Sequence, residues 1–182
     1  MACAISREID GQIELVPTNA NASPPVLLAA NPLSKVPALI TEDGVGLFDS
    51  PVICEYLDAL EGALPLFPRS GGARWLALKH QAMGDGIMDA AVARRGETQR
   101  PQEAARDALM ARYKAAVDRT VAVLEAEVPH QTVDIGTISV GCALGYLDFR
   151  YADEPWREGH PRLTAWYGAF AQDKALSATA PA

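Results

Sequence analysis

The stretch from Asn31 to Leu57 constrains the fold more than any other part of the sequence. It contains Lys35-Val36-Pro37, in which a proline separates a short loop from an apolar run. A peptide bond before proline can be cis, and this geometry turns the backbone of the preceding residue outward. We therefore expect an extended ligand to form hydrogen bonds with the main chain of Val36.

Two apolar runs follow the proline, Ala38–Ile40 and Leu47-Phe48, and they flank the polar tip Glu42-Asp43-Gly44. An Asp-Gly pair between apolar runs is a strong signal for a β-hairpin, because both residues tolerate the backbone angles of a tight turn. The sequence therefore predicts a short antiparallel hairpin directly after the proline.

A helix start follows the hairpin at Asp49-Ser50-Pro51. This triplet offers a capping side chain and then a proline at the first helical position, where its missing N–H costs nothing. Ile53 and Leu57 mark one face of the predicted helix. A helix N-terminus with free N–H groups and a hydroxyl suits a carboxylate, so we predict a pocket for a small peptide-like anion.

The order NPL-x-KVP, hairpin, F-DS-P-x-I-x-EYLD resembles the thioredoxin-like half of a glutathione S-transferase, in particular the small bacterial members. In that family the residue before the cis-proline binds the cysteinyl part of glutathione through its backbone, and an acidic-Ser pair at the helix start holds the γ-glutamyl end. The signature is specific because several parts occur in a fixed order. The resemblance spans the chain from about Ile13 to its end.

The resemblance implies a glutathione-binding site made of Lys35, Val36, Pro37, Asp49 and Ser50. Val36 and Pro37 take the cysteinyl role, Asp49 and Ser50 the γ-glutamyl role, and Lys35 lies near the glycyl carboxylate. For Ser50 alone, a simple helix cap is the competing interpretation. The upstream KVP motif favours ligand contact.

The second half of the chain is predicted to be helical. Residues 61–72 are rich in Pro and Gly and form a linker. Apolar residues at helical spacing predict helices over about 73–95 and 102–126. The fold class is an α/β thioredoxin-like N-terminal half plus an all-α C-terminal half, with residues 1–61 as a glutathione-binding domain and 72–182 as a helical domain.

A third predicted helix, IGTISVGCALGYLDF, is apolar almost all the way round, which indicates the buried centre of the helical half. Asp134 can cap it, and Thr137 sits at the N3 position. The family usually has Ser or Thr at the cap and Asp at N3, so the two residue types are exchanged here, but Asp can still accept the N3 N–H. His160-Pro161 opens a last amphipathic helix.

The N-terminal residues depart from the family pattern. Ala2–Gly11 is interpreted as the tail of a helix, and Ile13–Val16 as a short strand. In the family, a central strand and a loop with the activating Ser, Cys or Tyr come before that helix. We expect this segment to be absent here, which leaves the Ile13–Val16 strand without its ladder partner. The catalytic residue therefore stays unassigned.

Charge and composition exclude several classes of partner. The 182 residues carry a formal net charge of −7. Phosphate binding needs concentrated Lys and Arg, so no nucleic-acid partner is expected. No apolar run is long enough to cross a bilayer, and no basic segment followed by an apolar one marks a secretory signal. We predict a cytoplasmic protein without a membrane partner.

Cysteines and histidines give no sign of a metal site. Cys3, Cys54 and Cys142 are few, odd in number and unclustered, which argues against a disulfide framework and a zinc site. Cys54 and Cys142 fit small buried hydrophobes. The histidines lack metal-ligand spacing, so no metal is expected; they are His80, His130 and His160.

The first long helix leaves two interpretations open. Its polar residues lie either on a solvated face or beside the electrophile pocket that the family forms there; they are Asp85, Asp89 and Arg94. Its apolar residues either shape an acceptor pocket or belong to the core; they are Ile87, Met88 and Ala91.

The resemblance implies an enzyme that conjugates the thiol of glutathione, used as co-substrate, to a small electrophile, and it implies a homodimer. The alternative is a non-catalytic glutathione-binding or scaffold protein that uses the fold for dimerisation, because the activating segment is not recognisable. Retention of the KVP and DS motifs argues against a scaffold. A thiol-disulfide oxidoreductase is disfavoured, since the sequence has no Cys-x-x-Cys.

Overall fold

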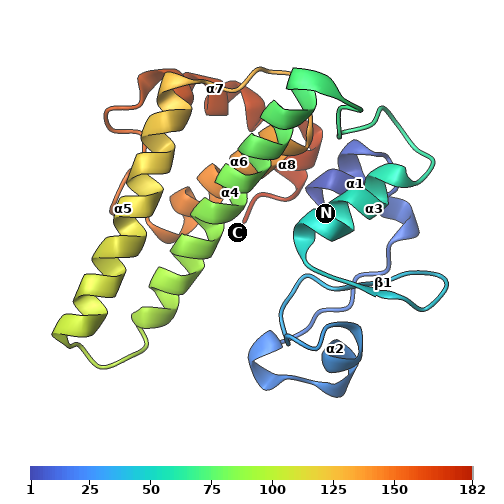
Figure 1. Ribbon diagram of the computed structural model, residues 1–182, viewed down its shortest axis with the longest axis horizontal. Coiled ribbons are helices and arrows are strands. Elements are labelled where there is room, and N and C mark those ends of the chain that lie inside the picture. The colour runs from blue at the N-terminus through green and yellow to red at the C-terminus, as the bar shows by residue number, and fades with distance from the viewer. Residues whose placement is uncertain (182) are drawn as a thin grey trace. The chain divides into compact units, whose positions relative to one another are not determined.

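The computed structural model describes residues 1–181 and forms two compact units. The N-terminal unit comprises Cys3–Phe67, and the C-terminal unit begins at Pro68 (Figure 1). No helix among the described residues is both long and apolar enough to cross a membrane.

The N-terminal unit combines short helices with one hairpin. Its elements are α1 (Ala2–Ser6), the 3₁₀ turns η1 (Asp10–Gln12) and η2 (Ala20–Ala22), α2 (Pro25–Ala30), β1 (Leu39–Ile40), β2 (Gly46–Leu47) and α3 (Ser50–Ala59). The predicted hairpin is confirmed, because β1 and β2 pair in antiparallel fashion with Leu39 opposite Leu47. The predicted helix after Asp49 is confirmed as α3.

Two predictions for the first sixteen residues are wrong. Ile13–Val16 forms no strand, and Leu15 and Val16 are 64% and 62% exposed. The sheet of the described residues has only the strands β1 and β2, so this segment has no ladder to join. The predicted helix tail is also shorter than expected, because α1 ends at Ser6 and a separate 3₁₀ turn contains Gly11.

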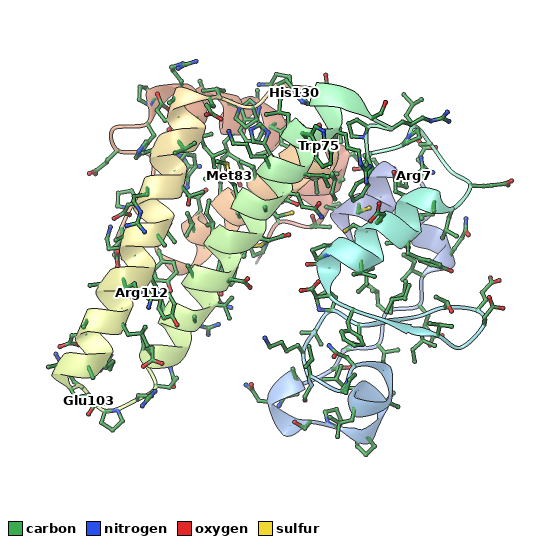
Figure 2. The ribbon with its side chains drawn as sticks, in the orientation of Figure 1. Arg7, Trp75, Met83, Glu103, Arg112 and His130 are labelled. Carbon is green, nitrogen blue, oxygen red and sulfur yellow. The ribbon has the colours of Figure 1, made fainter. Side chains whose placement is uncertain are left out.

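A buried ion pair holds the N-terminal unit together. Arg7, which is 3% exposed, places Nε 3.3 Å from Oδ1 of Asp58 and donates from Nη2 to the carbonyl of Leu60 at 2.7 Å (Figure 2). The same carboxylate accepts from the backbone N–H groups of Leu66 at 2.7 Å and Phe67 at 3.0 Å. One carboxylate thus links α1, α3 and the segment that ends the unit.

The C-terminal unit is a helical bundle. Its helices are α4 (Gly71–Glu97), α5 (Ala104–Ala126), α6 (Ile135–Arg150), α7 (Pro161–Phe170) and α8 (Lys174–Ala178). The first four match the predicted helices, and α8 was not predicted. α6 lies at the centre, as expected from its apolar surface.

Glycines allow α4 and α6 to pack backbone against backbone. A Cβ atom at Gly84 of α4 would lie 2.5 Å from the backbone of Ser139, and one at Gly136 of α6 would lie 2.5 Å from the carbonyl oxygen of Ala77. Any larger residue at these two positions would push the helices apart. The predicted cap of α6 is confirmed nearby.

That cap is a capping box with exchanged residue types. The backbone N–H of Thr137 donates to Oδ1 of Asp134 at 2.8 Å, and the N–H of Asp134 donates to Oγ1 of Thr137 at 2.9 Å. Both residues are buried, so these two bonds satisfy N–H groups that would otherwise lie unpaired at the helix start.

Candidate functional site

Asn31 organises the loop that leads to the predicted ligand-binding residues. Its side chain is buried, its Nδ2 donates to the carbonyl of Lys35 at 2.8 Å, and its Oδ1 accepts from the N–H of Leu33 at 2.9 Å. We did not predict this role of Asn31 from the sequence. The signal was present, since an Asn that bonds the backbone two residues later forms a recurrent turn.

Val36 offers free backbone groups to a ligand. The residue is 55% exposed, and the Val36-Pro37 bond is cis. Among the hydrogen bonds of residues 1–181, none uses the N–H or the carbonyl of Val36. The main chain at this point therefore has a donor and an acceptor available to an extended molecule, and ligand binding by Val36 stays a prediction.

The start of α3 differs in detail from the prediction. Asp49 occupies the N-cap position, Ser50 is the first helical residue, and Pro51 is the second. The expected cap bond is absent, because the side chain of Asp49 accepts no hydrogen bond from the first turn of α3. The N–H groups of this turn consequently remain available to an anion.

Hairpin register brings the two halves of the site to the same end of the sheet. Leu39 opens β1 and pairs with Leu47, which closes β2. Pro37 lies two residues before this pair and Asp49 two residues after it. The Val36-Pro37 backbone and the start of α3 therefore lie on the same side of the hairpin, although they are separated in the chain.

Lys35 supplies the accessible positive charge of this unit. Residues 1–67 contain only two Lys or Arg residues, Arg7 and Lys35. Arg7 is buried against Asp58, whereas Lys35 is exposed. An anionic ligand at the N-terminal unit can thus use the Lys35 ammonium group and the α3 N-terminus as its favourable charges.

Cys3 is not suited to act as a nucleophile. Its thiol is 3% exposed and lies 3.8 Å from the carbonyl oxygen of Cys54. A hydrogen bond with Cys54 and burial together raise the pKa of the Cys3 thiol far above its usual range. The reactive form of a cysteine is the thiolate, so this thiol stays inert.

The three histidines are spread over the C-terminal unit. His80 is 1% exposed and neither ring nitrogen has a partner, His130 Nε2 lies 3.2 Å from Asp134, and His160 Nδ1 lies 2.7 Å from the carbonyl of Trp156. Within residues 1–181, no three side chains of His, Cys, Asp or Glu gather in a metal-binding arrangement.

The open interpretations for α4 are settled in part. Ile87 and Ala91 are each 1% exposed, so both are buried, and Ala91 also lines a cavity of the C-terminal unit. Arg94 is bonded to the carboxylate of Glu154, at 3.0 Å from Nη1 and 2.5 Å from Nη2. Its side chain therefore forms an ion pair within the C-terminal unit instead of standing alone on a solvated face.

Comparisons with known proteins agree with these observations. The profile of the glutathione S-transferase N-terminal domain matches residues 3–60, and that of the C-terminal domain matches residues 107–169. The uncharacterized GST-like protein YibF of Escherichia coli (strain K12) is 36% identical over 138 residues, which cover 73% of this chain and 68% of YibF.

Solved structures give the same result. A glutathione transferase family member from Pseudomonas fluorescens Pf-5, with bound glutathione, is 40% identical with a TM-score of 0.91 over 100% of this chain and 91% of that chain. A glutathione S-transferase from Methylobacillus flagellatus KT, with glutathione bound, is 31% identical with a TM-score of 0.88 over 100% and 92% of the two chains. The chain therefore belongs to the glutathione S-transferase family, with a thioredoxin-like N-terminal half and an all-helical C-terminal half.

Proposed function

We propose that this chain binds glutathione at the end of the β1–β2 hairpin and transfers its thiol to a small electrophile. One observation carries the proposal: the free main chain of Val36 and the uncapped start of α3 lie at the same end of one hairpin. Family members at 40% and 31% identity contain bound glutathione, which supports the choice of ligand.

Each group of the site matches one part of glutathione. The N–H and carbonyl of Val36 pair with the cysteinyl residue as a neighbouring strand would. The hydroxyl of Ser50 and the free N–H groups of α3 receive the γ-glutamyl carboxylate, and Asp49 receives its amine. The exposed ammonium of Lys35 attracts the glycyl carboxylate, and Pro37 shapes the backbone beside Val36.

The proposed reaction is attack of the glutathione sulfur on an electrophilic carbon. A thiol with a pKa of about 8.5 is only a few per cent ionised at neutral pH, so the enzyme must stabilise the thiolate by donating a hydrogen bond to it. The thiolate then forms a C–S bond, and either a leaving group departs or the carbon chain takes up a proton. Family membership alone supports two further parts of the proposal, a homodimer and a cytoplasmic location.

Titration calorimetry tests the binding step. Glutathione is titrated into the 182-residue protein and into the variants Ser50→Ala and Asp49→Asn. Ser50→Ala removes a hydrogen bond to the ligand carboxylate, and Asp49→Asn removes the negative charge that faces the ligand amine, so we expect affinity to fall about tenfold in each case, which corresponds to ~1.4 kcal/mol. Ser70→Ala is the matched control, because Ser70 is the N-cap of α4 and likewise makes no cap bond.

Turnover of 1-chloro-2,4-dinitrobenzene, a general electrophile, tests the chemical step. Conjugation by the unmodified protein supports the transferase. Glutathione binding without conjugation would favour the non-catalytic alternative. If glutathione does not bind at all, the roles proposed for Val36, Asp49 and Ser50 are wrong.

A further inference from the structure

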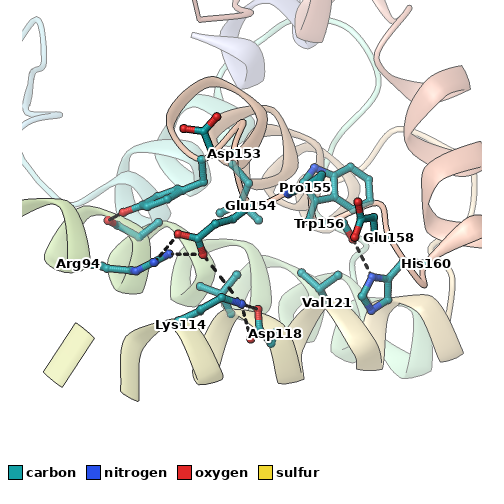
Figure 3. Close-up of a pocket in the computed structure, with 14 residues that line it drawn as sticks. Arg94, Lys114, Asp118, Val121, Asp153, Glu154, Pro155, Trp156, Glu158 and His160 are labelled. Carbon is teal, nitrogen blue, oxygen red and sulfur yellow. Dashed lines mark hydrogen bonds and ion pairs between the residues drawn. The ribbon is translucent and has the colours of Figure 1, made fainter. Parts of the chain in front are cut away.

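The C-terminal unit contains a cavity that has no part in the proposed glutathione site. Its volume is about 440 Å³, and its walls come from α4, α5, α6 and the loop between α6 and α7 (Figure 3). Cavities of this size hold small organic ligands. All its lining residues belong to the C-terminal unit, so this site stands independently of the proposed function.

The floor of the cavity is apolar and already formed. Ala91 and Val121 are each 1% exposed, Leu147 is 5% exposed, and Trp156 is 8% exposed. The indole N–H of Trp156 donates to Asp148 at 2.8 Å, which fixes the ring plane. An apolar floor of this kind favours the burial of a hydrocarbon or aromatic group. It has few hydrogen-bonding groups that could replace the water around a strongly hydrated group.

Both cationic side chains that line the cavity are already neutralised. Arg94 forms its two-pronged bond with Glu154 and lies over the ring of Tyr151 at 4.8 Å from the ring centre. Lys114 donates from Nζ to both oxygens of Asp118, at 2.9 and 2.7 Å (Figure 3). An anionic ligand would have to displace these carboxylates to gain a positive partner.

Two carboxylates of the lining have no such partner. Within residues 1–181, no ion pair or side-chain hydrogen bond involves Asp153 or Glu158. Figure 3 shows Asp153 turned away from the Arg94 and Glu154 side chains. The unpaired charge of the cavity is therefore negative, and an unpaired carboxylate beside an apolar floor favours a cation that brings its own apolar body.

We propose that this cavity binds a small organic ammonium ion. Its apolar body packs on Val121, Leu147 and Trp156, and its ammonium group lies at the solvent-exposed rim, to which Asp153 and Glu158 contribute the unpaired negative charge. Glutathione carries two carboxylates and one ammonium group, so its net charge is negative, like that of the rim. The cavity and the hairpin site thus select ligands of opposite charge.

Three related probes test the charge preference, namely 4-phenylbutylamine, 4-phenylbutanol and 4-phenylbutanoate. Binding is followed by the indole N–H signals of the three tryptophans, and the Trp156→Phe variant identifies the signal at the cavity floor. We expect the amine to shift the Trp156 signal and to bind at least about tenfold more tightly than the carboxylate. Equal affinities, or shifts that leave Trp156 unchanged, would overturn the proposal.

Variants distinguish binding of the amine in the cavity from non-specific attraction of a cation to a protein with a negative net charge. The double variant Asp153→Asn/Glu158→Gln keeps the side-chain shapes, and we expect it to weaken amine binding about tenfold while phenylbutanol binding stays the same. Glu103→Gln is the matched control, because Glu103 is exposed and lies outside the lining. If Glu103→Gln weakens the amine as much as the double variant does, the site is not the cavity.

Discussion

Replacing Asp58 by Ala should remove a large part of the stability of the N-terminal unit. The Asp58 carboxylate receives three groups: the guanidinium of Arg7 and the backbone N–H groups of Leu66 and Phe67. The side chain of Arg7 is 4% exposed, so water cannot replace the lost partner without a rearrangement. A buried charge and two N–H groups would be left unpaired at once.

The expected cost is large relative to the unit. Breaking a buried ion pair by removal of one partner costs about 3–5 kcal/mol. Single domains are stabilised by roughly 0.05–0.15 kcal/mol per residue, so a unit of this length has on the order of 3–10 kcal/mol in total. Asp58→Ala should therefore leave the N-terminal unit partly unfolded under native conditions, while the helices of the C-terminal unit persist.

Urea unfolding followed by circular dichroism, together with amide hydrogen exchange, measures this effect. We expect the loss of exchange protection to concentrate in Cys3–Phe67. The double variant Arg7→Met/Asp58→Leu removes the buried charge as well, so it should be more stable than Asp58→Ala alone. Asp43→Ala at the exposed hairpin tip is the control, with an expected change below about 0.5 kcal/mol. A cost below about 1 kcal/mol for Asp58→Ala would refute the reasoning.

Three further changes test the C-terminal unit. Burial lowers the pKa of His80 from its usual 6.5. Below pH 6.5 the unfolded chain therefore binds more protons at this histidine than the folded protein does, and the folded protein becomes less stable as the pH falls. Urea melts at several pH values should show this loss of stability, and the His80→Leu variant should lack the part that His80 contributes. Gly136→Ala places its Cβ 2.5 Å from a backbone oxygen of α4, whereas Gly86→Ala meets nothing within 4 Å; thermal melts should show a loss of about 1–3 kcal/mol for the first and a small gain for the second. Thr137→Val removes one arm of the capping box with Asp134 and should cost about 1 kcal/mol in the same melts.

Local signals in the sequence were sufficient for the hairpin and for the starts of α6 and α7. The Asp43-Gly44 tip predicted a turn, and α7 begins at Pro161, as the His160-Pro161 pair indicated. The same local logic was wrong for Ile13–Val16, since a strand needs a partner that only the whole fold can provide.

Contacts between distant segments were not visible in the sequence. The ion pair between Arg7 and Asp58 joins residues that are far apart in the sequence of the N-terminal unit. The side chain of Asn31 forms hydrogen bonds with the backbone of the loop that follows it. The bond between Arg94 and Glu154 likewise required the packing of α4 beside the loop that follows α6. The residue types alone did not predict these contacts, because many charged side chains on protein surfaces form no ion pair.

The backbone N–H signals of the protein during a glutathione titration test the central claim most directly. We predict that the Val36 and Ser50 signals shift first and most, with saturation at one glutathione per chain, and that the signals of the α4–α7 bundle core change little. Glutathione binding that leaves Val36 and Ser50 unchanged, or that shifts only signals of the C-terminal unit, would contradict the account.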